Sequence, residues 1–397
     1  MHAGFEGSPV APYAILFKAH FWDDFVQRRF DFLKSRARGG DVWVIVDETH
    51  GSVPGINHDR IIRTCEADLK IIGLANYSES NTNSNWYNND YQLIYFYRHY
   101  PEYIFYITIE YDAVFNGDFD VFANTAIGRE TDLVAHPIST PTNEWFWLHT
   151  CEEVWPANRI LHQLLCISGF SNRAVAQIDA VRVAHSKLYA DGQLTKWPFC
   201  EGFVPTALHE AGFKLEPLTN YGGTGFYDWW PPYHESQIAD VPAANFIHPV
   251  LTGRRYTDSM LRHAKNCRQY FDRNSDLRLR LEFETPENVI AALFEVFRHN
   301  GDRQALADLY SIVAEAGMGD YGLNFGTALA ESIKPRKKQN ILQDIPHQKE
   351  DIEVLYLERD ETKTKLKHLK PQTGRFHKNV FWRLTAPFRS MWHNKNK

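Results

Sequence analysis

Hydrophobic and polar positions follow two alternating patterns in the first part of the chain. Short apolar runs, typical of buried strands, lie at 13–18 and 41–47. The segment between them, 23–36, has apolar residues at intervals of three and four positions, which predicts a helix. Two strands joined by a helix favour a parallel pair, so the pattern indicates an α/β fold.

The same alternation continues along the chain. A long apolar run at 103–115 predicts a central strand. Other expected elements are helices at 90–99, 157–165 and 203–212, strands at 131–136 and 213–217, a turn at Gly169, and a loop at 221–233. Segments 286–299 and 302–316 predict a helical hairpin. We therefore expect a mostly parallel sheet flanked by helices, followed by a smaller helical part.

Two carboxylates, Glu110 and Asp112, end the predicted central strand. Residues i and i+2 of a strand point the same way, so both side chains can face one cation. Mg²⁺ and Mn²⁺ prefer oxygen ligands, and Mg²⁺ often takes one or two carboxylates together with substrate phosphates. A parallel sheet binds ligands outside the carboxyl ends of its strands. The pair is a candidate metal site; a solvated strand end is the alternative.

Composition narrows the class of protein. With 397 residues and 44% apolar residues, the chain can bury a large core. The five cysteines are an odd number without C-x-x-C spacing, so we expect reduced core thiols, not a disulfide framework or zinc cluster. No apolar run of about 18 residues and no signal-peptide pattern are present, which favours a cytoplasmic protein.

Charge separates an acidic body from a basic tail. Residues 334–397 carry 16 Lys and Arg against 7 Asp and Glu, a balance of +9 in a chain of net charge −6. Segment 378–392 mixes aromatic and basic residues, as in segments that lie on an anionic membrane surface. We expect peripheral binding to the inner membrane leaflet or, alternatively, a disordered solvated end. The acidic body makes nucleic-acid binding an unfavourable interpretation.

Several strings in this order resemble a bacterial glycosyltransferase of the GT-A nucleotide-sugar fold. They are the first strand 14–17, Val46-Asp-Glu-Thr49, Trp86-Tyr-Asn-Asn-Asp-Tyr91, Ile109-Glu-Tyr-Asp112, Ile167-Ser-Gly-Phe-Ser-Asn-Arg173, Glu201-Gly-Phe-Val-Pro-Thr206 and Phe246-Ile-His-Pro249. The resemblance covers roughly residues 12–250. It implies a catalytic domain at 10–260, followed by a helical subdomain at 261–333 and the tail at 334–397.

The resemblance also implies a ligand set for the metal. Glu110 and Asp112 take the place of the D-x-D motif, with Glu instead of the first Asp. His248 would return to the cation and complete the set, although a lone His is often a hydrogen-bonded surface residue. The implied cofactor is Mn²⁺ or Mg²⁺, which neutralises charge on the departing nucleoside diphosphate. The longer arm of Glu110 could instead hold the sugar or ribose.

Further residues take roles from the same resemblance. Asp47 and Asp90 would contact the nucleoside, and Trp86 would stack on the base; capping and core packing are their alternatives. Gly169 would let the backbone approach the sugar. Glu201 would deprotonate the acceptor hydroxyl in an inverting reaction, or else serve as an acid at a helix start.

The expected function is therefore transfer of a sugar from a nucleotide sugar, most simply a UDP-sugar, to a glycan or lipid-linked acceptor. Two alternatives stay open. One is a metal-dependent phosphoesterase that uses Glu110, Asp112 and His248. The other is a non-catalytic module that tethers glycan-assembly machinery to the membrane.

Overall fold

The computed structural model describes residues 11–75, 77, 84–141 and 145–315. The predicted membrane-surface segment and the rest of the tail at 334–397 lie outside these residues. Within the described part of the chain, no helix is both long and apolar enough to cross a membrane.

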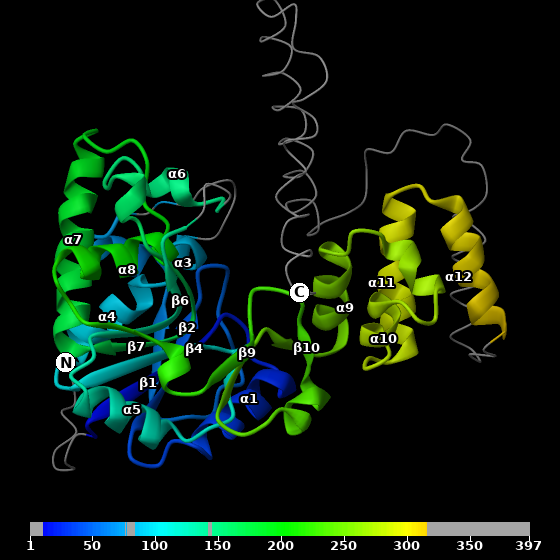
Figure 1. Cartoon of the computed structure of the whole chain (residues 1–397), viewed down its shortest axis with the longest axis horizontal. Coiled ribbons are helices and arrows are strands. Elements are labelled where there is room, and N and C mark those ends of the chain that lie inside the picture. Colours follow the sequence, from blue (N-terminus) through cyan, green and yellow to red (C-terminus); the bar gives the residue numbers. More distant parts are fainter. Residues whose placement is uncertain (1–10, 76, 78–83, 142–144, 316–397) are drawn as a thin grey trace, which may run out of the picture.

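A seven-stranded sheet forms the centre of the first unit (Figure 1). Its strands, in spatial order, are β3 (Ile61–Thr64), β2 (Asp41–Asp47), β1 (Tyr13–Ala19), β4 (Phe105–Glu110), β7 (His162–Ser171), β6 (Leu133–Ser139) and β8 (Leu215–Pro217). The pairs β3–β2, β2–β1, β1–β4 and β6–β8 are parallel, whereas β7 runs antiparallel to both β4 and β6. The fold is mixed α/β with a mostly parallel sheet, as predicted.

Helices cover both faces of this sheet. One face packs against α1 (Asp24–Lys34) and α5 (Phe119–Gly128), and the other against α4 (Tyr91–His99), α7 (Asn172–Ala190) and α8 (Cys200–Glu210). Shorter helices are α2 (Glu66–Ile71), α3 (Ser84–Tyr87) and α6 (Leu148–Cys151). Short 3₁₀ turns lie at Ala157–Arg159, Leu218–Asn220, Glu235–Asp240 and Cys267–Phe271.

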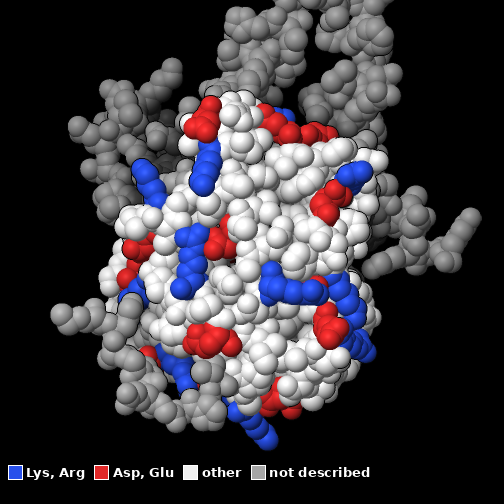
Figure 2. Space-filling view, turned by 90° about the vertical axis from the view of Figure 1, so that its left-hand side faces the viewer, with Lys and Arg blue, Asp and Glu red and all other residues white. Residues whose placement is uncertain are grey.

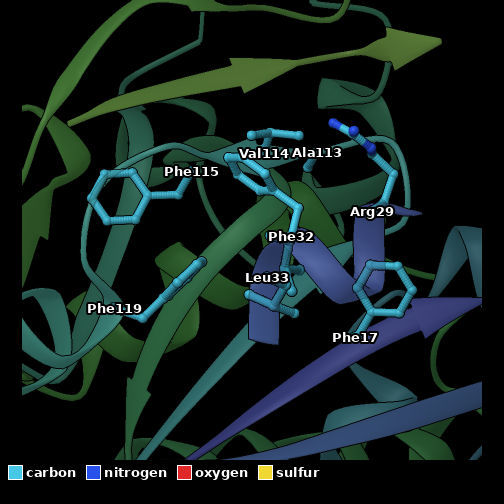
Figure 3. A pocket seen from close by; sticks show the side chains of 9 residues that line it. Phe17, Arg29, Phe32, Leu33, Ala113, Val114, Phe115 and Phe119 are labelled. Atoms are coloured by element: carbon cyan, nitrogen blue, oxygen red, sulfur yellow. The ribbon is translucent and has the colours of Figure 1, made fainter. Parts of the chain in front are cut away.

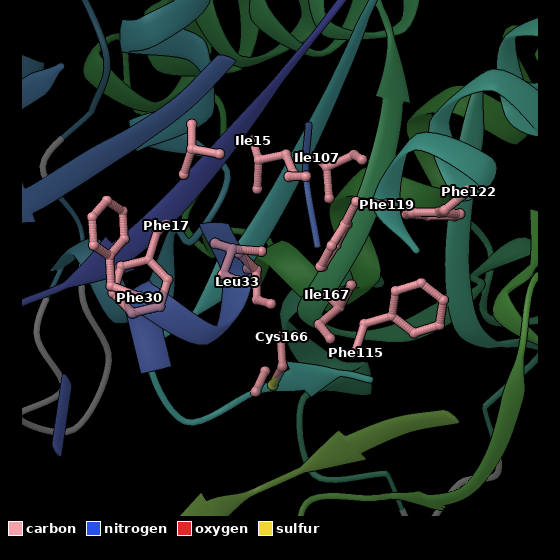
Figure 4. Packing of buried hydrophobic residues seen from close by; sticks show 14 of the residues in the cluster. Ile15, Phe17, Phe30, Leu33, Ile107, Phe115, Phe119, Phe122, Cys166 and Ile167 are labelled. Carbon is pink, nitrogen blue, oxygen red and sulfur yellow. The ribbon is translucent and has the colours of Figure 1, made fainter. Parts of the chain in front are cut away.

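Alternation along the strands explains the two cores. In β1, Tyr13, Ile15 and Phe17 point to the α1 side, and Ala14 and Leu16 point to the α4 side. Figure 4 shows part of the first core, where residues of β1 and α1 meet aromatic rings around α5. A strand that is buried on both faces reads as a continuous apolar run, as the sequence does here.

Small strands beside the main sheet bring later residues back to it. β5 (Val114–Phe115) follows β4 directly and pairs antiparallel with β11 (Asn245–His248). β11 also pairs with β9 (Gly223–Tyr227), and β10 (Tyr233–His234) pairs with β12 (Val250–Leu251). The predicted loop at 221–233 is confirmed at 228–232 but was wrong at Gly223–Tyr227, where strand pairing with β11 overrides the glycine-rich composition.

A helical unit follows the sheet unit and lies beside β10 in Figure 1. It consists of α9 (Gly253–Arg262), α10 (Asp276–Leu281), α11 (Pro286–His299) and α12 (Arg303–Glu315). The last two helices confirm the predicted hairpin. The buried core of this unit already includes Leu251 and Tyr256, N-terminal to the boundary expected at position 261.

Two local predictions around β7 were wrong. Residues 157–165 do not form a helix: a short 3₁₀ turn at Ala157–Arg159 leads into β7, which also includes the predicted turn at Gly169. The apolar residues 164–167 are spaced ambiguously, and a strand flanked by β4 and β6 supplies hydrogen bonds on both edges.

The side of the molecule that lies at the left in Figure 1 faces the viewer in Figure 2. The coloured side chains of the described residues there alternate between acidic and basic across a mostly uncharged surface (Figure 2). The excess of acidic residues in the body therefore does not gather on this side.

Candidate functional site

The carboxyl ends of three parallel strands meet at one edge of the sheet. Lys18 of β1 is paired in register with Glu110 of β4, and Asp47 ends the neighbouring β2. Lys18 is buried, and burial lowers the pKa of its ammonium, while Glu110 and Asp47 act in the opposite direction. This arrangement confirms that Asp47 and Glu110 share an edge of the sheet. Asp47 also caps the loop that follows, accepting a hydrogen bond from Thr49 N at 2.9 Å.

A hydrogen-bonded chain fixes the position of the Glu110 carboxylate. Lys18 Nζ donates to the carbonyl oxygen of Asn89 at 2.7 Å and also to its side-chain Oδ1. The side-chain Nδ2 of Asn89 in turn donates to Glu110 Oε1. The carboxylate of Glu110 also interacts with the Cys166 thiol, through a side-chain hydrogen bond that helps to raise the pKa of that thiol.

Asp112 lies in the turn between β4 and β5, two residues beyond the end of β4 at Glu110. The expectation that both carboxylates occupy positions i and i+2 of one strand was therefore wrong, because the chain turns directly after Glu110 to form β5. The side chain of Asp112 is 17% exposed, and Oδ1 is buried without a hydrogen bond from the described residues. Burial, assisted by the negative charge of Glu110, raises the pKa of Asp112 to about 6, while His248 opposes that shift. Ionisation of the Asp112 carboxyl group is therefore unfavourable unless a positive charge binds beside it.

His248 returns to this turn from much later in the chain, as predicted. Its Nε2 lies 3.9 Å from Asp112 Oδ1. Its Nδ1 lies 2.7 Å from the carbonyl oxygen of Asp228, which can only accept a hydrogen bond. The proton of a neutral ring is therefore held on Nδ1, and the Nε2 lone pair is directed away from Asp228, the usual arrangement for a metal-binding His.

Cys166 is a fourth possible ligand, which the sequence analysis had placed among the core thiols. One ligand atom each from Glu110, Cys166 and His248 lies within 4.8 Å of the other two. Cys166 is 7% exposed, and burial raises the pKa of its thiol well above the usual value, with Glu110 and Asp112 adding to the effect. The structure thus supplies sulfur, nitrogen and carboxylate donors at one place.

Glu201 lies in the first turn of α8, next to the β7 end of this cluster. Burial raises the pKa of its carboxyl group to about 8, and the charge of Glu110 contributes in the same direction. The N–H of Leu165 acts against these effects. A carboxyl group with a raised pKa is suited to accept a proton from a hydroxyl group, the role that the resemblance implies for Glu201.

Arg255 is a candidate residue that sequence reasoning missed. It comes from α9 of the helical unit, stacks 3.9 Å from the ring centroid of Phe21 and pairs with Asp23 at 2.8 Å. Phe21 in turn packs against Tyr111, which separates the two carboxylates in the chain. No local motif marks Arg255, because only the placement of α9 brings it to this edge.

The carboxylate of Asp90 forms a buried ion pair with Arg182 and is not exposed to solvent. Both of its oxygens accept hydrogen bonds from Arg182, at 2.8 and 3.0 Å, and both side chains are 0% exposed. The guanidinium also packs 3.6 Å from the ring centroid of Phe203. The carboxylate of Asp90 thus joins the start of α4 to α7, and the nucleoside contact stays a prediction.

Trp86 is 51% exposed and belongs to an aromatic group near the start of α8. It contacts Trp147 edge to face, with ring centroids 5.9 Å apart, and Phe199 at 5.3 Å. Phe199 precedes α8 and is two residues from Glu201. The exposed face of Trp86 is therefore available to a planar or apolar ligand, and the prediction of base stacking stays open.

Gly169 does not serve the purpose that the sequence suggested. It lies within β7, opposite Ile107 of β4. A Cβ at this position would lie 2.7 Å from two ring atoms of Phe105 and 3.4 Å from Phe122. The glycine is required by aromatic packing inside the core, so it is not placed to let a ligand approach the backbone.

A small apolar pocket lies on the other side of the carboxyl end of β4 (Figure 3). It is lined by Phe17, Arg29, Phe32, Leu33, Ile109, Ala113, Val114, Phe115 and Phe119. Ile109 faces this pocket, whereas its neighbour Glu110 contacts Asn89 of the α4 side. The pocket is therefore separate from the cluster of donor atoms.

The donor atoms gathered at this edge are of the types that hold divalent cations in proteins. Among the described residues, neither Glu110 nor Asp112 forms an ion pair with an Arg or Lys side chain, so a bound cation would relieve their mutual repulsion. Neither a search of protein-family models nor a search of curated proteins found a match to this chain.

Proposed function

We propose that the protein is a metal-dependent glycosyltransferase of the GT-A type that uses a nucleotide-diphosphate sugar as donor. The observation that carries the proposal is the convergence of Glu110, Asp112 and His248 at the carboxyl edge of a mostly parallel sheet. Ligands of such sheets bind at this edge. In the part of the chain that the structure describes, no Arg or Lys side chain lies within ion-pair distance of these carboxylates, which suits a metal ion that bridges to a diphosphate.

In this proposal Glu110, Asp112 and His248 hold the cation, which when bound neutralises charge on the leaving diphosphate. Glu201 takes the proton of an acceptor hydroxyl. The acceptor oxygen then forms a bond to the anomeric carbon, while the bond from that carbon to the diphosphate oxygen breaks and the nucleoside diphosphate leaves with the electron pair. A single displacement of this kind inverts the configuration.

Other residues of the same edge have supporting roles in this proposal. Asn89 orients Glu110 and is itself held by Lys18. Asp47 contributes to nucleoside binding, and Trp86 offers an exposed aromatic face. The proposed acceptor is a glycan or a glycan carried on a lipid. Peripheral binding of the tail at 334–397 to the inner leaflet would bring the enzyme to a lipid-linked acceptor.

Thermal unfolding in the presence of UDP, Mn²⁺ or both tests the proposal. We expect UDP and Mn²⁺ together to raise the melting temperature more than the sum of their separate effects, because each binds the folded state more tightly when the other is present. Asp112→Asn should abolish the joint effect, whereas Asp31→Asn on the exposed side of α1 should retain it.

A panel of nucleoside diphosphates extends the test if UDP is the wrong nucleotide. Failure of all nucleoside diphosphates to bind, with Mn²⁺ or Mg²⁺ present, contradicts the proposal. Hydrolysis of phosphate esters without an acceptor would instead identify a phosphoesterase. Full turnover by Glu201→Gln in a transfer assay would remove Glu201 from its role as base.

A further inference from the structure

The donor atoms at the edge of the sheet differ in chemical type from an all-oxygen site. Cys166 offers sulfur, His248 nitrogen and Glu110 oxygen, and these three atoms lie within 4.8 Å of one another. In a tetrahedral zinc site, bonds of about 2.0 to 2.3 Å place ligand atoms roughly 3.5 Å apart. Shifts of about 1 Å in the side chains would therefore close the cluster around one ion.

The backbone places Cys166 beside Glu110. In the antiparallel pair of β4 and β7, Ile109 lies opposite Ile167, so the next step of the same register sets Glu110 against Cys166. Directly opposed residues have Cβ atoms about 5 Å apart on the same face. Figure 4 shows Cys166 next to Ile167, at the border of the apolar core.

Neighbouring residues orient His248 and Glu110 as second-layer residues orient the ligands of a metal site. The carbonyl of Asp228 holds the proton of His248 on Nδ1 and leaves Nε2 with its lone pair. Asn89 orients Glu110 from the opposite side. An independent observation favours a cation at this place: Asp112 Oδ1 is buried, 3.9 Å from His248 Nε2, and accepts no hydrogen bond from the described residues.

We propose that Glu110, Cys166 and His248 bind a thiolate-preferring divalent cation of the Zn²⁺ class, with Cys166 coordinating through its sulfur. Soft thiolate ligands select Zn²⁺ over Mg²⁺ and Mn²⁺, so Cys166 determines which ion the site prefers. On binding, the Cys166 thiol releases its proton to the solvent and no other bond changes. Asp112 remains beside the ion as a further carboxylate ligand. The inference deepens the proposed function by making Zn²⁺ the preferred ion of its metal site, with Mn²⁺ or Mg²⁺ as weaker-binding substitutes, and it does not require nucleotide binding.

Titration with Co²⁺, which replaces Zn²⁺ in such sites, provides the first test. Wild-type protein should develop a near-ultraviolet charge-transfer band from sulfur to cobalt, and Zn²⁺ should displace the Co²⁺ and remove the band. Cys166→Ser should bind Co²⁺ without this band and bind Zn²⁺ about tenfold or more weakly. Cys267→Ser, a change in the helical unit where the thiol lies 3.6 Å from Leu261 O, should behave as wild type.

X-ray absorption at the zinc edge of the wild-type protein gives a second test that needs no variant to fold. One sulfur at about 2.3 Å from Zn²⁺ would support the proposal. A shell of only nitrogen and oxygen would overturn it, as would an unchanged Zn²⁺ affinity of Cys166→Ser or a failure of the wild type to bind Zn²⁺ or Co²⁺. Retention of joint UDP and Mn²⁺ binding by Cys166→Ser would leave the proposed function intact.

Discussion

Individual residues in this protein show how the same amino acid can serve packing or chemistry according to its surroundings. Cys166 and Cys151 are both buried thiols, but only Cys166 lies beside a carboxylate and an imidazole. Position 169 requires a glycine, since the Phe105 ring occupies the space that a side chain would need. At this scale, a role is decided by what lies within about 4 Å.

Replacing Gly169 by Ala should destabilise the protein by about 1 to 3 kcal/mol, because the added methyl group meets the Phe105 ring in a closely packed core. Gly225→Ala in β9 is the matched control, since a Cβ there meets no atom within 4 Å. Chemical denaturation of both variants measures the difference. Equal stabilities would show that the core relaxes around the methyl group.

His185 of α7 should make stability fall at acidic pH. Burial, assisted by the charge of Arg182, lowers the pKa of His185 from 6.5 to about 4. The unfolded chain then binds a proton more readily than the folded one between these values. The contribution of His185 is fully present above about pH 6.5 and is lost as pH falls through about 4, by on the order of 2 to 3 kcal/mol.

Denaturation of wild type and His185→Gln between pH 4 and pH 7 isolates this effect, because the other titrating groups are common to both proteins. We expect the variant to lose less stability on acidification. Parallel curves would mean that His185 titrates with its ordinary pKa in the folded protein.

Pairs of elements are joined by contacts that periodicity alone does not indicate. Helices α4 and α7 share two ion pairs: Asp90 with Arg182, fully buried, and Arg98 with Asp179, at 27% and 17% exposure. The buried pair lies under aromatic rings, and the other lies near the surface. Because desolvation differs between the two, the pairs should respond differently to the loss of one charge.

We expect Asp90→Asn to lower the free energy of unfolding by about 3 to 5 kcal/mol, since it leaves the Arg182 guanidinium buried without a counter-charge. Asp179→Asn, which breaks the second pair between the same two helices, should cost about 1 kcal/mol or less. If Asp90→Asn instead weakened nucleotide binding and left stability unchanged, the nucleoside contact expected from the sequence would be supported.

The whole molecule combines a sheet unit and a helical unit at the proposed donor site. Arg255 connects them, reaching from α9 to Asp23 and Phe21 at the carboxyl edge of β1. A second connection joins His234 to Glu284 at 3.3 Å. Through Arg255, the helical unit places an Arg–Asp ion pair beside Phe21, which packs against Tyr111 between the two carboxylates.

Arg255→Ala should weaken binding of UDP in the presence of Mn²⁺ about tenfold, because a guanidinium near the diphosphate supplies charge-assisted hydrogen bonds. Arg254→Ala is the control: the neighbouring Arg pairs with Asp258 and Glu295 within the helical unit. Titration calorimetry at two salt concentrations measures both. An unchanged affinity for Arg255→Ala would restrict Arg255 to joining the two units.

The sequence by itself determined the order of β1, α1, β2, α4 and β4 along the chain, because side chains alternate with a period of 2 in a strand and 3.6 in a helix, and both periods are local. It also placed Asp47 and Glu110 at strand ends. The tertiary structure alone decided three features of the site. β7 runs antiparallel to β4, β11 brings His248 back to the turn after β4, and α9 brings Arg255 to Asp23. Pairing register and domain packing join residues far apart in the chain, and no nearby residue pattern encodes which distant strand or helix will be the neighbour.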